Sequence, residues 1–191
     1  MKIYSLLLGA GLVLATAASA QTVVTIGSGL AHDCYLAAKY GIDLRSGVDT
    51  CNAAIAHDAL DKKNKAATYD NRGIVLDALG RTDMAAGDFN RSIALDPGLG
   101  DPYVNLGSML IKQKQYAEAL AQINKGLDVG MSFPHIGYYD RAVAEQIMGR
   151  FTEAYYDYKK VLEIEPNYTP ATERLKDFTV TITREPVKSP S

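Results

Sequence analysis

Residues 69–97 read YDNRGIVLDALGRTDMAAGDFNRSIALDP, and the same pattern returns twice further along the chain. The second copy starts at Tyr103 and the third at Tyr138, so the offsets are 34 and 35 residues. Seven positions keep their spacing in every copy: Tyr69, Arg72, Gly73, Leu76, Ala85, Phe89 and Pro97; then Tyr103, Leu106, Gly107, Leu110, Ala119, Ile123 and Met131; then Tyr138, Arg141, Ala142, Glu145, Ala154, Tyr158 and Pro166. Because all seven positions shift together, the copies indicate a repeating structural unit.

Each copy predicts two helices that pack against one another. The aromatic, small and apolar residues at the start of a copy are four and three positions apart, so they share one helix face. The small residues lack bulk and allow the second helix to approach closely; they are Gly73, Gly107 and Ala142. Gly80 and Gly149 suit the turn between the two helices, because glycine adopts the left-handed conformation that ends a helix. Proline at 97 and 166 ends the second helix, since it cannot continue the hydrogen-bond ladder.

In period and spacing these copies resemble the tetratricopeptide repeat family. The resemblance implies an all-α fold, a right-handed α-solenoid of about three stacked helix pairs. We assign these pairs to residues 66–99, 100–133 and 135–168. A degenerate pair is expected at 31–62, where Tyr35, Cys51 and Ile55 fit the pattern but Lys39 replaces the glycine. Residues 169–178 are expected to form a capping helix that covers the last pair with Leu175 and Phe178.

The chain has two cysteines, Cys34 and Cys51, and both precede the clear copies. In an exported protein such a pair predicts a disulfide, and closing this loop would stabilise the fold by about 3 kcal/mol. In strict repeat register the two residues do not face each other, so the bond requires a shorter first helix and a shifted Ile42–Ser46 loop. Two unpaired buried thiols are the alternative, while a metal pair has no nearby Cys-x-x-Cys or His-x-x-x-His partner.

Residues 1–20 have the pattern of a secretory signal peptide. Lys2 supplies a positive charge, residues 6–17 are apolar, and residues 18–20 are small enough for cleavage. An uncleaved anchor is the alternative, but Gly9 and Gly11 interrupt a run that is short for a membrane span. We therefore expect an exported protein, periplasmic or secreted, with no stable membrane anchor after cleavage. Residues 21–30 are then a linker and 179–191 a flexible tail.

Composition and spacing narrow the classes of function. The formal net charge of −2 becomes −3 when Lys2 is removed with the leader, and so mild an acidity gives no support for nucleic-acid binding. His32, His57 and His135 lack the spacing that places metal ligands on one helix face, and no cofactor is expected. A metal-dependent envelope hydrolase using these histidines stays open as an alternative. A self-associating structural subunit that uses Tyr155 and Tyr156 is another.

The family resemblance itself implies a non-catalytic scaffold or adaptor of the cell envelope. In this family the first helices of successive pairs line a groove that holds a peptide or a partner's helix. The groove residues implied here are Asp70, Asn71, Asp77, Asp101, Asn105, Ser108, Lys112, Tyr139 and Asp140.

The charges of these groove residues predict the kind of partner. A subgroup of the family grips a C-terminal carboxylate with lysines, an arginine and asparagines, and most of those cations are missing here. Four aspartates beside Lys112 favour a partner segment with basic and apolar side chains. Alternatively, the aspartates only keep an exposed face soluble.

Overall fold

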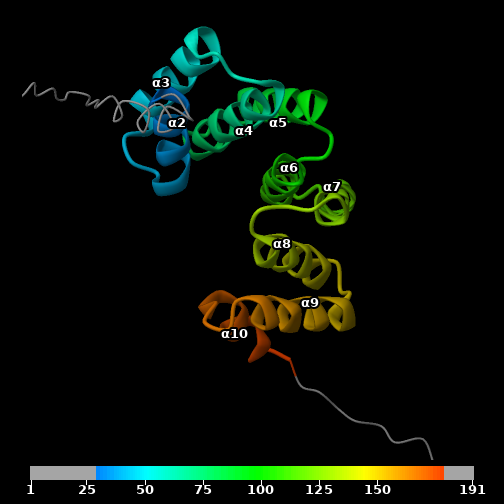
Figure 1. Ribbon diagram of the computed structural model, residues 1–191. Helices are drawn as coiled ribbons and strands as arrows, with labels where there is room; N and C mark the ends of the chain where they lie inside the picture. The colour runs from blue at the N-terminus through cyan, green and yellow to red at the C-terminus, as the bar shows by residue number, and fades with distance from the viewer. Residues whose placement is uncertain (1–28, 179–191) are drawn as a thin grey trace, which may run out of the picture. The chain divides into compact units, whose positions relative to one another are not determined.

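The computed structural model describes residues 29–178, and their regular structure is entirely helical, as predicted. The expected signal peptide, most of the expected linker and the tail at 179–191 lie outside these residues. The chain divides after Asp96 into two compact units. Within residues 29–178 the first unit contains α2 (Gly29–Tyr40), α3 (Leu44–His57), α4 (Lys62–Ala78) and α5 (Thr82–Leu95), and the second contains α6 (Asp101–Lys112), α7 (Tyr116–Val129), α8 (Pro134–Ile147), α9 (Phe151–Ile164) and α10 (Thr169–Leu175) (Figure 1).

The helices α2 and α3 form a tight hairpin at the start of the first unit. Their loop spans only residues 41–43, and both Gly41 (φ 63°) and Asp43 (φ 44°) take the left-handed conformation. The Asp43 side chain accepts a hydrogen bond from the backbone N–H of Ser46 at 3.4 Å and so caps α3. A Cβ atom added to Gly47 would lie 2.8 Å from Cβ of Ala37, so the two helices touch at this point.

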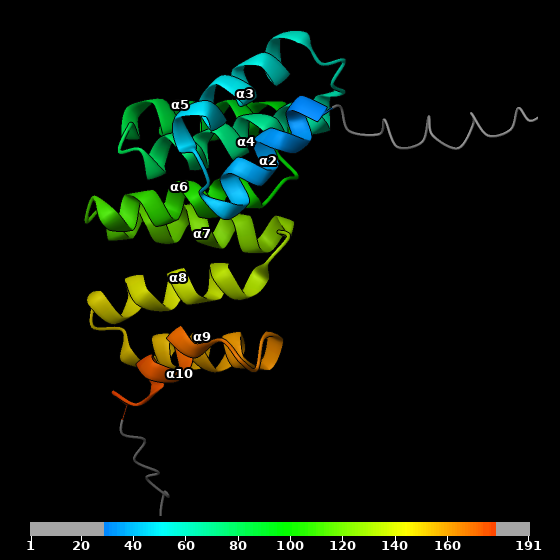
Figure 2. The ribbon, with the colours of Figure 1, turned by 90° about the vertical axis from the view of Figure 1, so that its left-hand side faces the viewer.

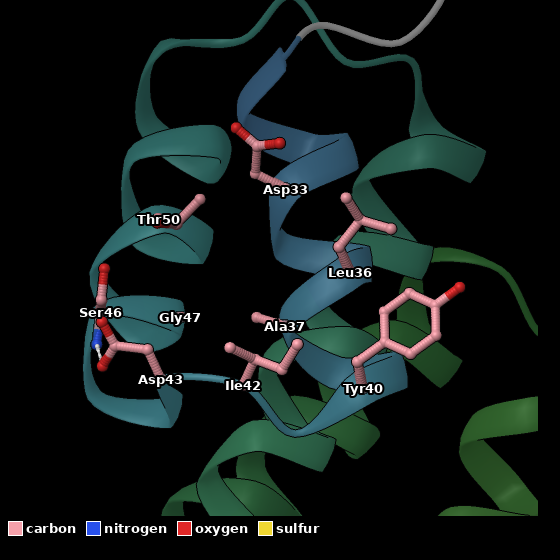
Figure 3. Close-up of a pocket in the computed structure, with 9 residues that line it drawn as sticks. All are labelled: Asp33, Leu36, Ala37, Tyr40, Ile42, Asp43, Ser46, Gly47 and Thr50. Atoms are coloured by element: carbon pink, nitrogen blue, oxygen red, sulfur yellow. Dashed lines mark hydrogen bonds between the residues drawn. The ribbon is translucent and has the colours of Figure 1, made fainter.

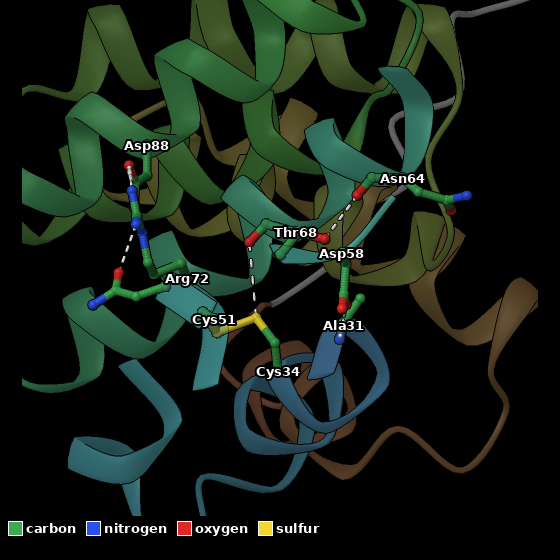
Figure 4. Close-up of a disulfide and its surroundings, with 9 residues drawn as sticks. Ala31, Cys34, Cys51, Asp58, Asn64, Thr68, Arg72 and Asp88 are labelled. Carbon is green, nitrogen blue, oxygen red and sulfur yellow. Dashed lines mark hydrogen bonds and ion pairs between the residues drawn. A yellow bond between two sulfur atoms is a disulfide. The ribbon is translucent and has the colours of Figure 1, made fainter. Parts of the chain in front are cut away.

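Cys34 and Cys51 form the predicted disulfide between α2 and α3, with Sγ atoms 2.05 Å apart and Cα atoms 4.8 Å apart (Figure 4). Both residues are fully buried. The short first helix and the tight loop bring the cysteines opposite each other, which strict repeat register does not. The backbone N–H of Ala31 also donates to the carboxylate of Asp58 at 3.1 Å, tying the start of α2 to the end of α3.

The pair α4 and α5 packs through a glycine, as the sequence pattern predicts. A Cβ atom added to Gly73 would lie 2.5 Å from Cε1 of Phe89, so the aromatic ring rests directly on the backbone of α4. Phe89 is buried, together with Val75, Leu76 and Ala85. α5 ends at Leu95, immediately before the Asp96-Pro97 sequence. The close contact between Gly73 and Phe89 leaves no room for a larger side chain at position 73.

The second unit repeats this packing twice, and Figure 2 shows α6 to α9 running side by side. A Cβ atom added to Gly107 would overlap Cγ1 of Ile123, which is buried with Val104 and Ala119 between α6 and α7. Four buried residues of α8 and α9 form the core of the last pair, and Ala171 of α10 joins them; the four are Ala142, Ala154, Tyr158 and Val161.

The turns between paired helices occupy one equivalent position in all three copies. Gly80 and Gly149 have φ angles of 73° and 77° there, as predicted for a glycine that ends a helix. The second copy has Lys114 at this position, with a φ angle of 63°. A side chain in this region of backbone space is strained, because its Cβ crowds the neighbouring carbonyl oxygen.

The helix α10 covers the open side of the last pair. Leu175 and Phe178 pack against the α8–α9 core, as predicted, and the Phe178 ring lies 5.9 Å from the ring of Tyr158. The regular helix ends at Leu175, three residues earlier than expected. None of the helices between residues 29 and 178 has the length and hydropathy to cross a bilayer.

Candidate functional site

The first helices of the two pairs in the second unit share a polar face. Asn105, Ser108 and Lys112 are three and four positions apart on α6, so they lie on one side of that helix. The Ser108 hydroxyl makes a hydrogen bond to the carboxylate of Asp140 on α8. This bond joins α6 directly to α8, the first helix of the next pair, and brings together two of the predicted groove residues.

Asp140 gives this face a carboxyl group that is largely removed from solvent. Burial raises the pKa of its carboxyl above the ordinary value, and the hydrogen bond from Ser108 and the positive charge of Lys112 oppose that rise. The ionised carboxylate is therefore short of solvation in the free protein. The Ser108 oxygen also lies 3.0 Å from the backbone carbonyl oxygen of Val104, so its single proton can go to either acceptor.

Tyr139 takes part in an aromatic cluster rather than standing open on the face. Its ring centroid lies 5.7 Å from that of Tyr158 and 5.4 Å from that of Tyr168. The Tyr168 ring in turn contacts His135 at 5.3 Å. A hydrogen bond to Tyr139 raises the pKa of Arg174 on α10. Tyr139 is therefore held against α9, Tyr168 and α10, next in sequence to Asp140.

Asp101 occupies the start of α6 and faces the loop that precedes α8. Its two carboxylate oxygens each lie 3.2 Å from the backbone nitrogen of Ser132, and Oδ2 lies 3.1 Å from the hydroxyl of Ser132. The carboxylate therefore accepts hydrogen bonds from within the unit. The sequence pattern did not reveal this loop contact, because residue 132 lies in the stretch where the repeat spacing lengthens.

The three remaining predicted groove residues lie on α4 in the first unit. Asp70 is buried, while Asn71 and Asp77 are half-buried. Asp70 and Asp77 are two helical turns apart and share a face of α4. Their role in holding a partner stays a prediction, separate from the α6–α8 face.

The three histidines lie on different elements, and among residues 29–178 no three His, Cys, Asp or Glu side chains gather as a metal site. His32 packs near Tyr35 on α2, with ring centroids 6.1 Å apart. Of the two tyrosines considered for self-association, Tyr155 packs on Phe178 with centroids 5.8 Å apart, whereas Tyr156 is exposed.

Residues 100–129 and 137–168 match the tetratricopeptide repeat family. Both matched segments lie in the second unit, where one contains α6 and α7 and the other contains most of α8 and all of α9, so this unit is built of tetratricopeptide repeats. No curated protein shows significant sequence similarity to this chain.

Several solved structures share its fold. The first TPR of Spaghetti (RPAP3), bound to the HSP90 peptide SRMEEVD, is 26% identical with a TM-score of 0.57, and the match covers 63% of this chain and 94% of that one. The first TPR domain of human RPAP3 is 25% identical with a TM-score of 0.57, and the match covers 60% of this chain and 90% of that domain. PilW, a type IV pilus biogenesis factor, is 22% identical with a TM-score of 0.67, and the match covers 79% of this chain and 69% of PilW.

Sequence reasoning missed a charged cluster that recurs in two of the repeats. Arg72 on α4 donates from Nε and Nη2 to the two carboxylate oxygens of Asp88 on α5, at 2.6 and 2.8 Å. Its Nη1 donates to the side-chain oxygen of Asn52 on α3 at 2.7 Å. One arginine thus links three helices of the first unit. The guanidinium carbon also lies 5.2 Å from the ring centroid of Tyr69.

The third repeat contains the same cluster with the same geometry. Arg141 donates to Asp157 at 2.6 and 2.8 Å and to Asn124 of the preceding helix at 2.8 Å. The second repeat has Leu106 and Gln122 at the equivalent positions. The signal was therefore present in the sequence, because arginine and aspartate, 16 residues apart, are either both present or both absent.

Glu145 is the other residue whose environment the sequence pattern did not predict. It occupies the position of Leu76 and Leu110 in the other repeats. The residue is only 9% exposed, and its Oε2 atom is buried without a hydrogen-bond partner in the protein. Burial, and then the negative charge of Asp157, raise its pKa to about 7. This repeat therefore keeps a titratable group where its neighbours have a core leucine.

Proposed function

We propose that this chain is a non-catalytic protein-interaction scaffold, and that the face shared by α6 and α8 holds a segment of a partner protein. The hydrogen bond between Ser108 and Asp140 is the observation that carries the proposal. It ties the two first helices together on the side of α6 that carries the half-buried Asn105 and the exposed Lys112. A surface that is already ordered loses little conformational entropy when a partner binds.

The chemistry of this face favours an extended peptide. An asparagine amide such as that of Asn105 contains both a donor and an acceptor of the kinds that pair with a peptide backbone. We propose further that the segment carries basic and apolar side chains, because a cation would compensate the poorly solvated carboxylate of Asp140 and the Tyr139 ring would cover an aliphatic stem. The RPAP3 structure with a bound HSP90 peptide supports the general mode, since that repeat domain shares 26% identity with this chain.

We also propose that the protein works in the cell envelope. The buried disulfide between Cys34 and Cys51 supports this location, because disulfides persist in oxidising compartments and are rare in the cytosol. Mass spectrometry of the protein from a periplasmic fraction should find a mature chain that begins at Gln21 and contains the disulfide. A full-length chain with reduced cysteines in the cytosolic fraction would contradict the location.

Affinity capture from envelope extract tests the binding face. We compare the wild type with Asn105→Ala/Lys112→Ala on the α6 face, and with the matched control Gln122→Ala/Lys125→Ala on α7. In each variant the amide is half-buried and the ammonium group belongs to an exposed lysine, so the two variants differ chiefly in location. We expect the same partner to be recovered with the wild type and the control and to be lost with the α6 variant. Equal recovery with all three proteins would refute the proposed face.

A further inference from the structure

A cleft of about 310 Å³ opens between α2 and α3 in the first unit, whereas the face proposed above belongs to the second (Figure 3). Successive turns of α2 contribute residues at spacings of three and four, which is one continuous helix side. The loop and the first turns of α3 complete the cleft. Its lining residues are Asp33, Leu36, Ala37, Tyr40, Ile42, Asp43, Ser46, Gly47 and Thr50. Its volume lies at the lower end of the range for small-ligand sites.

The floor of the cleft is tight and its rim is apolar. Ala37 and Gly47 bring the two helices into contact at the base, as the 2.8 Å approach to a Cβ on Gly47 shows. At the rim, Tyr40 is 58% exposed and Ile42 is 70% exposed. Leaving two large apolar side chains in water is unfavourable, and covering them would recover about 25 cal/mol for each Å² removed from water.

The charges that line the cleft are all negative. Asp33 lies toward one end and Asp43 toward the other in Figure 3, and no lysine or arginine lines the space between them. Lys39 of α2 does not line the cleft, and its Nζ lies 5.2 Å from the ring centroid of Tyr40 and 5.4 Å from that of Tyr35. An apolar channel with a carboxylate at each end complements a long aliphatic side chain that ends in a cation.

We propose that this cleft binds a lysine side chain, flanked by apolar residues, from a segment of a partner protein. The methylene stem lies along Leu36, Ala37 and Ile42, and the ammonium group reaches the carboxylate of Asp33 or Asp43. The flanking apolar residues cover the exposed rim.

The disulfide holds the walls of this site at a fixed spacing. Cys34 and Cys51 immediately follow the cleft residues Asp33 and Thr50 in sequence, so the covalent bond joins the two walls next to the lining side chains. The hydrogen bond from Ala31 to Asp58 adds a second tie between these helices. A site that is held open covalently does not lose loop and helix freedom when a ligand binds.

The probes are three capped tripeptides that differ only in the central residue: acetyl-Leu-Lys-Leu-amide, the glutamate analogue and the norleucine analogue. Methyl NMR of the full mature chain reports binding at Leu36, Ala37 and Ile42. We expect saturable shifts at these methyl groups with the lysine peptide, at least tenfold weaker binding of the glutamate peptide, and intermediate affinity for norleucine. Equal affinities for the three peptides, or lysine-peptide shifts confined to other residues, would overturn the proposal.

A variant without the two negative charges distinguishes the contribution of the carboxylates to peptide binding from the contribution of the apolar wall. Asp33→Asn/Asp43→Asn keeps the side-chain shapes, and asparagine both caps a helix and tolerates the left-handed backbone at residue 43. We expect about a tenfold loss of affinity for the lysine peptide, from two partly exposed ion pairs, and no change for norleucine. The control Asp49→Asn alters an exposed residue of α3 outside the cleft and should change the affinity for neither peptide. An unchanged lysine affinity in the double variant would exclude the assigned carboxylates. Because the cleft lies within the first unit, either result leaves the α6–α8 proposal standing.

Discussion

Replacing Asp88 by asparagine tests how much the charged cluster of the first unit contributes to stability. The Asp88 side chain is 1% exposed and accepts three hydrogen bonds: two from Arg72 at 2.6 and 2.8 Å and one from Arg91 at 3.0 Å. Removing one partner of a buried ion pair costs about 3–5 kcal/mol. Asparagine keeps one acceptor oxygen, and Arg91 can be solvated by water. We therefore expect the free energy of unfolding to fall by about 3 kcal/mol, the lower end of that range.

The equivalent change at Asp157 serves as the matched comparison. Asp157 is more exposed, with 11% of its side chain accessible, and it lies near the like charge of Glu145. Its ion pair is with Arg141, and Lys160, at the position of Arg91, pairs with Glu163 instead. We therefore expect Asp157→Asn to cost about 1–2 kcal/mol, less than the change in the first unit.

Urea unfolding followed by circular dichroism measures both losses, since the chain has no tryptophan for fluorescence. Hydrogen exchange assigns each loss to its own unit. As a further control, Arg72→Leu/Asp88→Gln installs the residues of the second repeat. This double variant should be more stable than Asp88→Asn, because no buried charge is left unpaired. The reasoning fails if Asp157→Asn is the costlier single change, or if the double variant is less stable than Asp88→Asn.

Three further predictions concern single features of the fold. Glu145→Leu should stabilise the protein by about 1–2 kcal/mol at pH 8, a value reduced for partial exposure to solvent. Folding raises the pKa of this carboxyl from 4.5 to about 7, so the protonated form stabilises the folded state at low pH, and that stability is lost as the pH rises from 4.5 to 7. The stabilisation by leucine should therefore shrink as the pH is lowered through the same range. A stabilisation that does not depend on pH would contradict the assignment. Cys34→Ser/Cys51→Ser should lower the free energy of unfolding by about 3 kcal/mol and speed hydrogen exchange first in α2 and α3. Exchange that speeds up equally in both units would show that the disulfide does not stabilise the α2–α3 hairpin locally. Lys114→Gly should stabilise by about 1 kcal/mol in thermal unfolding, because glycine adopts the observed φ of 63° without strain, and a destabilised variant would refute this explanation.

Much of the fold was readable from the sequence because repeats are built from local contacts. Gly73 and Gly107 were placed at tight helix crossings from their spacing alone, and both lie there. The disulfide partners followed from there being only two cysteines, but their alignment depended on the loop at 41–43, whose left-handed Asp43 the sequence pattern did not predict.

The candidate site was less predictable, because a position on a helix face does not identify the partner of a side chain. The groove pattern placed Asp101, Ser108 and Asp140 together as one polar set. The structure instead pairs Ser108 with Asp140 across α6 and α8 and turns Asp101 toward Ser132. These pairings join residues about 30 positions apart, so they depend on how one helix pair is seated against the next.

The sequence by itself determined the helix pairs, their turns and their small-residue contacts, since each depends on residues within one repeat period. Only the tertiary structure decided which polar side chains meet, which carboxyl groups are buried, and where a cleft opens between α2 and α3. Those properties arise from the distance between helices, and Gly47 and Ala37 set that distance at the base of the cleft through direct contact. A periodic pattern specifies which side of a helix faces its neighbour, whereas solvation and charge pairing depend on atoms that only packing brings together.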